Sequence, residues 1–349
     1  MSSQNVLGII GGGQLGSMLC QAAKKLNLDT VVLTDDADAP AKNFCDKYIY
    51  TDYTVEENLK KFVNSCDVIT FEFENIPFDI LKKLSEIKPV FPDPNINKIV
   101  QNRLLEKKYV NELNIKTTKY AEIKNKSDLI KNSFLLPGFL KTTTLGYDGK
   151  GQLFLDNINN LKIKDIDYSK NYILEKKINF SFEFSIILTR FQNKNIEIYD
   201  PFFNLHKNGI LYMTTTKIPE KIVRDDLEIA KDYSKEIAEK LNYIGTMCVE
   251  FFLDKDGPKL NEIAPRVHNS GHLTIEAYNI SQFENHVRAV MNLKNCITSL
   301  KYDAVMKNIL GNDIIEARKV DYSENQFFHD YLKTDIKENR KMGHLTELL

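Results

Sequence analysis

The first hundred residues alternate short apolar runs with amphipathic segments. The apolar run at residues 6–10 predicts a strand that ends in a glycine turn, and residues 15–26 have the hydrophobic spacing of a helix. Apolar runs at residues 30–33 and 68–73 predict two more strands. Strands and helices that alternate in this way are typical of an open, mostly parallel α/β sheet.

The pattern changes after the sequence FPDPN at residues 91–95, where two prolines predict a domain boundary. Residues 102–113 then predict an amphipathic helix with Leu105, Tyr109 and Leu113 on one stripe. The remaining chain mixes both kinds of element: short strands around a glycine-rich loop at 136–187, a helix at 227–241, paired strands at 247–253 and 259–263, and a small unit after 297.

Composition and charge narrow the class of protein. Hydrophobic residues make up 42% and charged residues 27% of the 349 residues, so we expect folded domains rather than disorder. A net charge of −1 predicts neither nucleic acid nor a membrane surface as a partner. The N-terminus lacks a basic leader, no apolar run approaches about 18 residues, and the five cysteines form no CxxC pair. These features predict a cytoplasmic enzyme with reduced thiols.

A glycine turn follows the first predicted strand. Gly11, Gly13 and Gly16 form a GxGxxG pattern, and Asp35 and Asp36 follow about 20 residues later, as in a dinucleotide fingerprint. Free N–H groups at the start of the next helix favour a phosphate or another polar ligand. A tight strand-to-helix turn that needs glycine for its backbone explains the pattern equally well. NAD or FAD binding therefore stays one of two interpretations.

An acidic pair is more specific. The turn signal DKDG, between two apolar runs, predicts a β-hairpin centred near Asp256, which places Glu250 opposite Glu262. Two carboxylates directly across a strand pair repel each other. A cation between them removes that penalty, and carboxylate oxygens with nucleotide phosphates favour Mg²⁺. The alternative is a pair of solvated glutamates, but the apolar residues on either side favour the metal site.

Five hydrogen-bonding residues come immediately after this hairpin: Arg266, His268, Asn269, Ser270 and His272. A core segment would need a buried partner for each of them. A surface loop could also contain them, but a loop that follows a metal ligand more often forms the wall of a site. Arg266 is suited to bind an anion through two hydrogen bonds, and His268 and Asn269 to orient a polar substrate.

The segment LKTTTLGYDGKGQ, residues 140–152, contains three glycines and two lysines. Glycines let a backbone approach phosphate oxygens closely, and the lysines supply positive charge. The spacing does not match a Walker A motif. A simple hairpin tip is the alternative, although Tyr147 and Asp148 are more reactive residue types than a bare turn needs.

Together these motifs resemble the ATP-grasp superfamily and, within it, the 5-(carboxyamino)imidazole ribonucleotide synthetases of purine biosynthesis. The matching segments follow one another along nearly the whole chain: GGGQLG, FEFENIP, QNRLLEK, GYDGKGQ, INFSFEFS, NLHKNGIL, VEFF, NEIAPRVHNSGH, SQFENHVRA and RKMGH. NEIAPRVHNSGH and GYDGKGQ are specific, whereas GGGQLG and VEFF prove nothing alone.

The resemblance implies an ATP-grasp fold of mixed α/β and α+β class. Its parts are a Rossmann-like pre-ATP-grasp domain at residues 1–100, an ATP-grasp domain at 101–296 and a small C-terminal lobe at 297–349. Within the ATP-grasp domain, a small ATP-binding lobe at about 115–180 precedes the metal-binding lobe. The resemblance also implies a homodimer.

The resemblance further assigns residues to ligands. Those implied to contact ATP are Arg103, Lys141, Gly146, Tyr147, Asp148, Gly149, Lys150, Gly151, Gln152, Glu175, Lys176, Lys177, Ile178, Glu183, His206, Asn261 and Glu262. Those implied to hold Mg²⁺ are Glu250 and Glu262. Those implied to bind the ribonucleotide are Gln14, Glu74, Asn269, Ser270, Lys333 and Arg340. Those implied to take part in catalysis are Tyr147, Asp148, Arg266 and His268.

The implied reaction has two steps. Bicarbonate attacks the γ-phosphate of ATP to give carboxyphosphate and ADP, and the amine of aminoimidazole ribonucleotide then captures the CO₂ that carboxyphosphate releases. Positioning and charge stabilisation are the protein's main tasks. Lys141 and the metal would offset phosphoryl charge, Arg266 and His268 would hold the carboxylate intermediate, and Asp148 would accept a proton or hydrogen bond from the amine.

Two departures and several rivals accompany this interpretation. Leu145 replaces a glycine that usually precedes GYDGKG, and Thr34 stands where an aspartate is common. Formate-dependent glycinamide ribonucleotide transformylase and biotin carboxylase are sibling alternatives that HNSGH and RKMGH argue against. An NAD-dependent oxidoreductase would leave GYDGKGQ and the acidic pair without a role. A non-catalytic nucleotide sensor with the same fold stays open.

Overall fold

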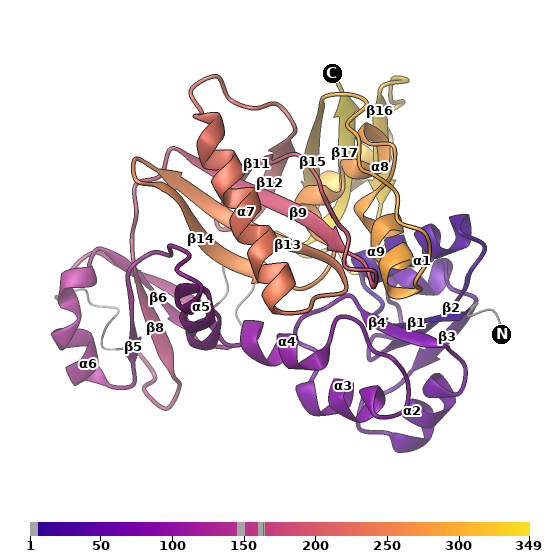
Figure 1. The fold of residues 1–349 in the computed structure, drawn as a ribbon, viewed down its shortest axis with the longest axis horizontal. Helices are drawn as coiled ribbons and strands as arrows, with labels where there is room; N and C mark the ends of the chain where they lie inside the picture. Colours follow the sequence, from indigo (N-terminus) through magenta and orange to yellow (C-terminus); the bar gives the residue numbers. More distant parts are fainter. Residues whose placement is uncertain (1–5, 145–150, 160–162, 164) are drawn as a thin grey trace.

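Three β-sheets organise the part of the chain that the structure, a computed structural model, describes: residues 6–144, 151–159, 163 and 165–349. A four-stranded parallel sheet is followed by a small four-stranded antiparallel sheet and a nine-stranded antiparallel sheet. Figure 1 shows the small sheet set apart at one end and the parallel sheet at the other, with the large sheet between them.

The N-terminal sheet has the strand order β3-β2-β1-β4, and all its pairs are parallel. Its strands are β1 (Val6–Ile10), β2 (Asp29–Thr34), β3 (Lys47–Tyr50) and β4 (Val68–Phe71). The helices of this region are α1 (Gln14–Lys25), α2 (Glu56–Val63), α3 (Phe78–Ser85) and α4 (Pro94–Val100). The predicted parallel sheet is confirmed. The edge strand β3 was missed because its sequence KYIY is short and none of its residues is fully buried.

The small sheet has the order β5-β8-β6-β7. Its strands are β5 (Tyr120–Ile123), β6 (Gly138–Thr142), β7 (Gln152–Leu155) and β8 (Tyr172–Lys176), and the helix α6 (Lys126–Lys131) packs beside them. Helix α5 (Arg103–Glu112) precedes this sheet in the chain and lies between it and the large sheet (Figure 1). It starts at Asn102, whose side chain accepts hydrogen bonds from the N–H groups of Leu104 and Leu105.

The large sheet has the order β14-β13-β9-β11-β12-β15-β17-β16, with β10 paired to β9. Its strands are β9 (Phe182–Arg190), β10 (Ile196–Ile198), β11 (Phe202–Lys207), β12 (Ile210–Thr215), β13 (Gly245–Asp254), β14 (Gly257–Ala264), β15 (Ala304–Leu310), β16 (Gln326–Asp330) and β17 (Lys341–Leu348). The helices are α7 (Arg224–Lys240), α8 (Thr274–Ala277), α9 (Gln282–Val290) and α10 (Asp313–Ala317). Because β12 pairs with β15, the C-terminal segment continues this sheet rather than forming a sheet of its own.

The predicted stripe on helix α5 is wrong at its first residue. Leu105 is 44% exposed, whereas Glu106 and Lys107 are buried at 2% and 1%. Val110 does join the apolar core, with Tyr109 packed against it. The helix therefore turns two charged side chains inward, which hydrophobic periodicity alone does not predict.

The structure also bears on the cysteines and on the search for membrane-spanning segments. Cys20, Cys66 and Cys248 are buried and Cys45 and Cys296 are partly buried, and none of the five is paired in a disulfide. Within the described residues, no helix combines the length and the apolar character that crossing a membrane requires.

Candidate active site

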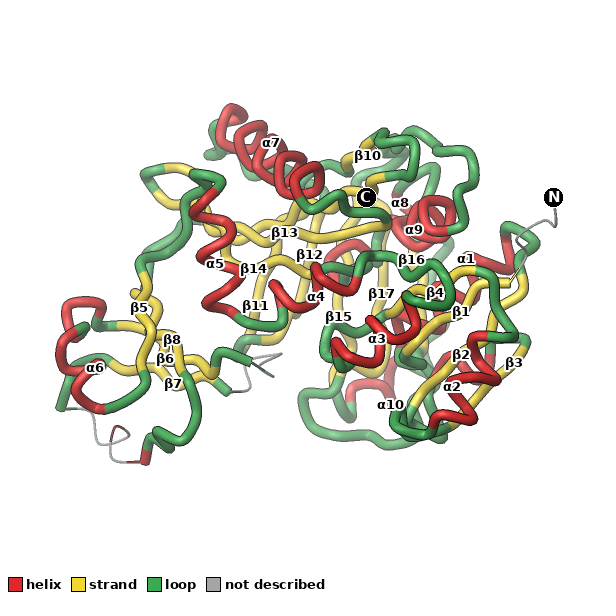
Figure 2. Tube along the Cα trace, turned by 60° about the horizontal axis from the view of Figure 1, so that its bottom comes forward, coloured by secondary structure: helices red, strands yellow, loops and turns green. Residues whose placement is uncertain are grey.

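A single large cleft brings the three sheets together. Its volume is about 1310 Å³, above the range of roughly 300–1,000 Å³ for pockets that take one small ligand. The loop after β1, helix α5, the small sheet, strands β11 to β14 and the segment before β17 all contribute to its walls. Figure 2 shows the small sheet facing the edge of the large sheet across this region. The size and the varied lining suit two polar ligands side by side.

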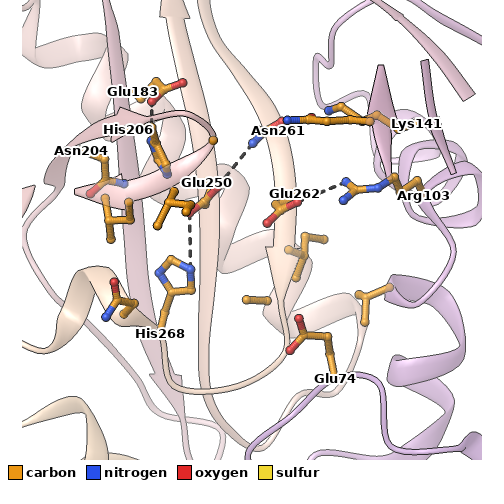
Figure 3. Close-up of a pocket in the computed structure, with 18 of the residues that line it drawn as sticks. Glu74, Arg103, Lys141, Glu183, Asn204, His206, Glu250, Asn261, Glu262 and His268 are labelled. Atoms are coloured by element: carbon orange, nitrogen blue, oxygen red, sulfur yellow. Dashed lines mark hydrogen bonds and ion pairs between the residues drawn. The ribbon is translucent and has the colours of Figure 1, made fainter. Parts of the chain in front are cut away.

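The acidic pair lies at the centre of the cleft, as predicted, but a β-bulge produces the pairing. The hairpin turn joins Asp254 to Gly257, so undisturbed pairing would set Glu250 opposite Asn261. A register shift after Glu250 makes Asn261 an extra residue and places Glu250 opposite Glu262. Asn261 and Glu262 consequently both line the cleft, although they are consecutive in the strand (Figure 3).

The acidic pair has too little compensation from its neighbours. Burial and the nearby Glu262 carboxylate raise the pKa of Glu250 to about 7. Its polar contacts are long: Asn261 Nδ2 donates to Oε2 at 3.4 Å, and His268 Nε2 lies 3.4 Å from Oε1. Among the described residues, Glu262 forms an ion pair with Arg103, whose Nη1 lies 3.2 Å from Oε2. A hard divalent cation would relieve this repulsion.

The donor set fits Mg²⁺ held jointly with phosphates. Among the residues that the structure describes, no cluster of three or more His, Cys, Asp or Glu side chains is arranged to enclose a metal ion. Mg²⁺ sites at nucleotides usually need only one or two carboxylates, because phosphate oxygens and water complete the shell. Glu250 and Glu262 supply that number, on the same side of one hairpin.

Positive charge lies on the side of the small sheet. Lys141 Nζ on β6 is held at 2.8 Å by Glu175 Oε2 on β8, and Lys107 Nζ lies 3.4 Å from the other oxygen of Glu175. Burial alone would raise the pKa of Glu175, but these two lysines lower it to about 2. Glu175, predicted as an ATP contact, therefore orients Lys141, and both residues line the cleft.

The same side of the cleft contains an apolar region. Phe139, Ile178, Phe180 and Phe252 line it, and the rings of Phe180 and Phe252 stack with their centroids 4.7 Å apart. Three predicted ATP contacts, Lys176, Lys177 and Gln152, also line the cleft. Aromatic faces beside exposed backbone are suited to a planar heterocycle such as a purine.

Glu183 and His206 form a pair at the far end of the acidic hairpin. Glu183 Oε2 lies 2.6 Å from His206 Nδ1. Burial alone would lower the pKa of His206, but the hydrogen bond to Glu183 and the charge of Glu250 raise it. Both predicted residues line the cleft (Figure 3). Asn204, two residues before His206 on β11, also lines the cleft but was not predicted as a site residue. Its place in the matching segment NLHKNGIL could have identified it.

The GxGxxG turn binds a carboxylate of the protein itself. Glu72 Oε1 accepts from the N–H of Gly13 at 2.7 Å, and Oε2 accepts from the N–H of Gly16 at 3.0 Å. A Cβ atom at Gly11 or Gly13 would come within 2.7 Å of Glu72. Glu72 thus occupies the position where a dinucleotide would place its pyrophosphate, so the interpretation as an NAD or FAD site is wrong.

The ribonucleotide residues predicted from the resemblance gather at the opposite end of the cleft. Arg266 makes a two-point ion pair with Glu74 through Nε and through Nη2, the latter at 3.1 Å. Burial alone would raise the pKa of Glu74, but Arg266 lowers it. Lys333 Nζ donates to Gln14 Oε1 at 2.7 Å, although the two residues are 319 positions apart. Arg340 lines the same end and donates to the backbone oxygen of Asp335 at 2.8 Å.

The segment after the acidic hairpin divides into lining and supporting residues. His268 and Asn269 line the cleft. Ser270 does not: it is fully buried, and its hydroxyl lies 2.8 Å from His268 Nδ1, so the predicted direct contact with substrate is wrong. His272 is fully buried beside Tyr331 and His344 and supports the loop from behind.

The tautomer of His268 follows from the residues behind it. Its Nδ1 accepts from the backbone N–H of Ser270 at 3.3 Å, so the ring proton lies on Nε2. Burial and the Arg266 charge hold the pKa of His268 well below its ordinary value, which keeps the ring neutral. His268 therefore presents an Nε2–H donor to the cleft, toward Glu250.

Five predicted residues of the glycine loop lie outside the described residues: Gly146, Tyr147, Asp148, Gly149 and Lys150. Gly151, at the end of the loop, has a positive φ of 73°, which favours glycine. Its carbonyl accepts from the N–H of Thr142, which closes the described base of the loop at 2.9 Å.

Three family models match the chain in succession. They are a ribonucleotide synthetase preATP-grasp domain at residues 4–101, an ATP-grasp domain at residues 108–283 and a phosphoribosylaminoimidazole carboxylase C-terminal domain at residues 304–348. The N5-carboxyaminoimidazole ribonucleotide synthase of Brucella melitensis is 38% identical over 99% of this chain and 96% of its own length. The chain belongs to the N5-carboxyaminoimidazole ribonucleotide synthase family. This confirms the resemblance drawn from NEIAPRVHNSGH and GYDGKGQ.

Solved structures of the synthase family have the same fold. The Staphylococcus aureus N5-carboxyaminoimidazole synthetase complexed with ADP is 35% identical, with a TM-score of 0.93 over 100% of this chain and 94% of that chain. The Aspergillus clavatus synthase in complex with ADP and 5-aminoimidazole ribonucleotide is 25% identical, with a TM-score of 0.91 over 100% of this chain and 95% of that chain. The expected ATP-grasp architecture is thereby confirmed.

Proposed function

We propose that this member of the synthase family is a ligase that carboxylates 5-aminoimidazole ribonucleotide in purine biosynthesis. ATP drives the formation of the new C–N bond, bicarbonate supplies the carbon, and the product is 5-carboxyaminoimidazole ribonucleotide. Family membership supports the substrate and the use of ATP. The observation that carries the chemistry is the cleft itself, where the Glu250–Glu262 pair separates a lysine-rich end from an end that contains Arg266 and His268.

The lysine-rich end suits ATP. The purine would lie on the apolar region of Phe139, Ile178, Phe180 and Phe252, with its phosphates directed toward Lys141 and Arg103. A Mg²⁺ ion held by Glu250 and Glu262 would neutralise phosphate oxygens as charge develops on them. Lys141 is already oriented by Glu175, so it needs little rearrangement to meet a phosphate.

The opposite end suits the second half of the reaction. Bicarbonate attacks the γ-phosphorus, ADP leaves, and the resulting carboxyphosphate breaks into CO₂ and phosphate. The amine nitrogen then forms a bond to the CO₂ carbon and loses one proton. Arg266 carries a fixed positive charge for the carboxylate, and the neutral His268 donates from Nε2 without introducing a second cation. Asp148 stays assigned to the amine, and Tyr147 to catalysis, by resemblance alone.

Further parts of this proposal concern the whole protein. We propose functional units at residues 1–100, 101–296 and 297–349, a homodimeric assembly and a cytoplasmic location. Lys333 and Arg340 would bind the phosphate of the ribonucleotide. Lys333 donates to Gln14, which belongs to the first unit, and Arg340 lines the same cleft, so this ligand would bridge two units.

Phosphate release from ATP tests the proposal directly. The assay contains Mg²⁺, bicarbonate and aminoimidazole ribonucleotide, with each omitted in turn. We expect release to require all three and the carboxylated ribonucleotide to form in equal amount. ATP turnover that the ribonucleotide does not stimulate would exclude this substrate while leaving ATP binding intact. Biotin or glycinamide ribonucleotide, offered in place of the imidazole substrate, tests the sibling activities.

A further inference from the structure

Helix α5 buries a charged face beside the metal-binding hairpin. Arg103, Glu106 and Lys107 have the spacing i, i+3 and i+4, which places them on one side of a helix. Glu106 and Lys107 are 2% and 1% exposed. Buried charges are destabilising unless each one has hydrogen-bonding partners. Their partners therefore indicate what this face of the helix does.

Those partners are three consecutive residues of strand β14. Lys107 Nζ donates to the backbone oxygen of Asn261 at 3.2 Å. Arg103 Nη1 donates to the Glu262 carboxylate at 3.2 Å. Glu106 Oε1 accepts from the backbone N–H of Ile263 at 2.5 Å. One helical face thus contacts every residue from 261 to 263.

These three residues begin at the irregular point of the hairpin. The register shift at Glu250 leaves Asn261 as an extra residue, and such a bulge interrupts the hydrogen bonds of the strand pair. The bulge is also what directs both Asn261 and Glu262 into the cleft. A regular strand would not need support from outside the sheet, whereas this segment receives it from side chains of α5.

We propose that Glu106 and Lys107 are positioning residues that hold the β14 bulge, so that Asn261 and Glu262 face Glu250 across the cleft. Lys107 is not among the described residues that line the cleft, so it acts through the groups it contacts. Its Nζ also lies 3.4 Å from Glu175, which orients Lys141. The same buried lysine therefore couples the metal ligand to the phosphate-binding lysine. This inference rests on the proposed function, in which Glu262 binds a divalent cation together with ATP.

Metal binding in the presence of ADP tests the inference without turnover. The free Mn²⁺ signal in electron paramagnetic resonance reports binding of Mn²⁺ to the wild-type chain and to the variants Lys107→Met and Glu106→Leu. Both variants remove the support of the bulge while keeping similar volume. We expect their affinity for Mn²⁺ to fall about 10- to 100-fold, as for other partners that orient metal ligands. In steady-state assays, the Mg²⁺ requirement should rise while the KM for the ribonucleotide stays unchanged.

Matched controls come from the same helix. Lys108 and Glu112 form an exposed pair 4.0 Å apart, so Lys108→Met and Glu112→Gln change the same residue types on the solvent side. Both should bind Mn²⁺ as the wild-type chain does. Glu106→Gln keeps an oxygen that can accept from the N–H of Ile263, so it should lose less affinity than Glu106→Leu. An equal loss in both Glu106 variants would mean that the charge itself binds the metal, and would overturn the positioning role.

The possible failures are distinguishable. If the wild-type chain with ADP binds no Mn²⁺, the proposed metal site is wrong. If the wild-type chain binds Mn²⁺ and Lys107→Met and Glu106→Leu bind it equally well, only the positioning role is wrong. Circular dichroism and thermal unfolding identify a variant that does not fold. Should Lys107→Met be such a variant, the contrast between Glu106→Gln and Glu106→Leu decides the question.

Discussion

Two regions of this molecule, the glycine turn and the acidic hairpin, looked like ligand sites in the sequence. In the structure they differ in whether their carboxylates have close hydrogen-bonding partners within the protein. At the glycine turn, both oxygens of Glu72 receive short hydrogen bonds, from Gly13 at 2.7 Å and from Gly16 at 3.0 Å. At the acidic hairpin, Glu250 faces a second carboxylate, and its polar contacts within the described part of the chain, to Asn261 and His268, are 3.4 Å long. The first region is complete without a ligand, and the second is not.

The difference teaches which feature identifies a site. Burial raises the pKa of both Glu72 and Glu250. At Glu72 two backbone N–H groups act against that effect, whereas at Glu250 the neighbouring Glu262 adds to it. A motif shows only that a phosphate or a metal could bind. Charge that the protein leaves uncompensated shows where one is needed.

The largest effect that would test this comparison is expected from Glu262→Gln. The substitution keeps the shape of the side chain but removes one of the two charges that attract the metal. We expect kcat to fall by about 100- to 1,000-fold, as when a group that stabilises transition-state charge is removed. Steady-state phosphate release at saturating Mg²⁺ measures this. Near-normal kcat in a folded variant would contradict the assignment of the acidic pair.

A pH dependence should follow from the raised pKa of Glu250. This carboxyl ionises at about 7 instead of 4.5, so below about 7 a metal ion must displace its proton. The affinity for Mg²⁺ should therefore rise about tenfold per pH unit up to that point and then level off. Calorimetric titration of Mg²⁺ into the ADP complex between roughly pH 5 and 8 measures the curve.

The same ionisation affects the stability of the metal-free protein in the opposite sense. Between about 4.5 and about 7 the folded state holds a proton on Glu250 that the unfolded state has lost. The contribution of this group to stability is thus full below about pH 4.5 and is lost as the pH rises through about 7.

In Glu262→Gln the pKa of Glu250 should be lower, so the midpoint of Mg²⁺ binding should move to lower pH. A midpoint that does not move would show that Glu262 is not the cause.

A smaller effect, on stability, is expected at the glycine turn. Glu72→Gln leaves one acceptor oxygen for two backbone N–H groups and places an amide NH₂ near the other. We expect the free energy of unfolding to fall by about 1–3 kcal/mol, the usual penalty for a buried donor without an acceptor. Urea unfolding measures the loss. An unchanged stability would show that Glu72 does not complete this turn.

The last prediction is that one ligand, NAD⁺, has no effect. NAD⁺ should leave thermal unfolding unchanged, because Glu72 occupies the turn that its pyrophosphate would need. ADP with Mg²⁺ should stabilise the same protein, by about 2.7 kcal/mol at a concentration 100 times the dissociation constant. Stabilisation by NAD⁺ that persists in the presence of saturating ADP and Mg²⁺ would reopen the dinucleotide interpretation.

Much of the fold was predictable, and the errors have local causes. The parallel order of the first sheet and the β13–β14 hairpin follow from apolar runs and turn residues close in sequence. The strand β3 escaped because an edge strand need not be apolar. Leu105 was wrongly predicted to lie on the buried side of its helix, because helix α5 packs the charged residues Glu106 and Lys107 inward. Hydrophobic periodicity identifies the apolar face of a helix, but in α5 a charged face is buried as well.

In the candidate site, too, some features could be predicted from local sequence and others could not. Glu250 and Glu262 were paired correctly, but from a turn centre one half-residue away from the true one, and the bulge at Asn261 made up the difference. A bulge depends on contacts from α5, more than 150 residues earlier in the chain, so local sequence does not contain it. Ser270 was placed in the substrate site although it supports His268 from behind.

Residue types and short spacings were enough to identify the family, the order of the elements and most of the polar residues that line the cleft. They were not enough to identify which of these polar groups already have hydrogen-bonding partners within the protein. Glu72 meets Gly13 across 59 positions and Lys107 meets Asn261 across 154, and such pairings depend on how distant segments pack. Partners of this kind separate a completed turn from a site that still needs its ligand.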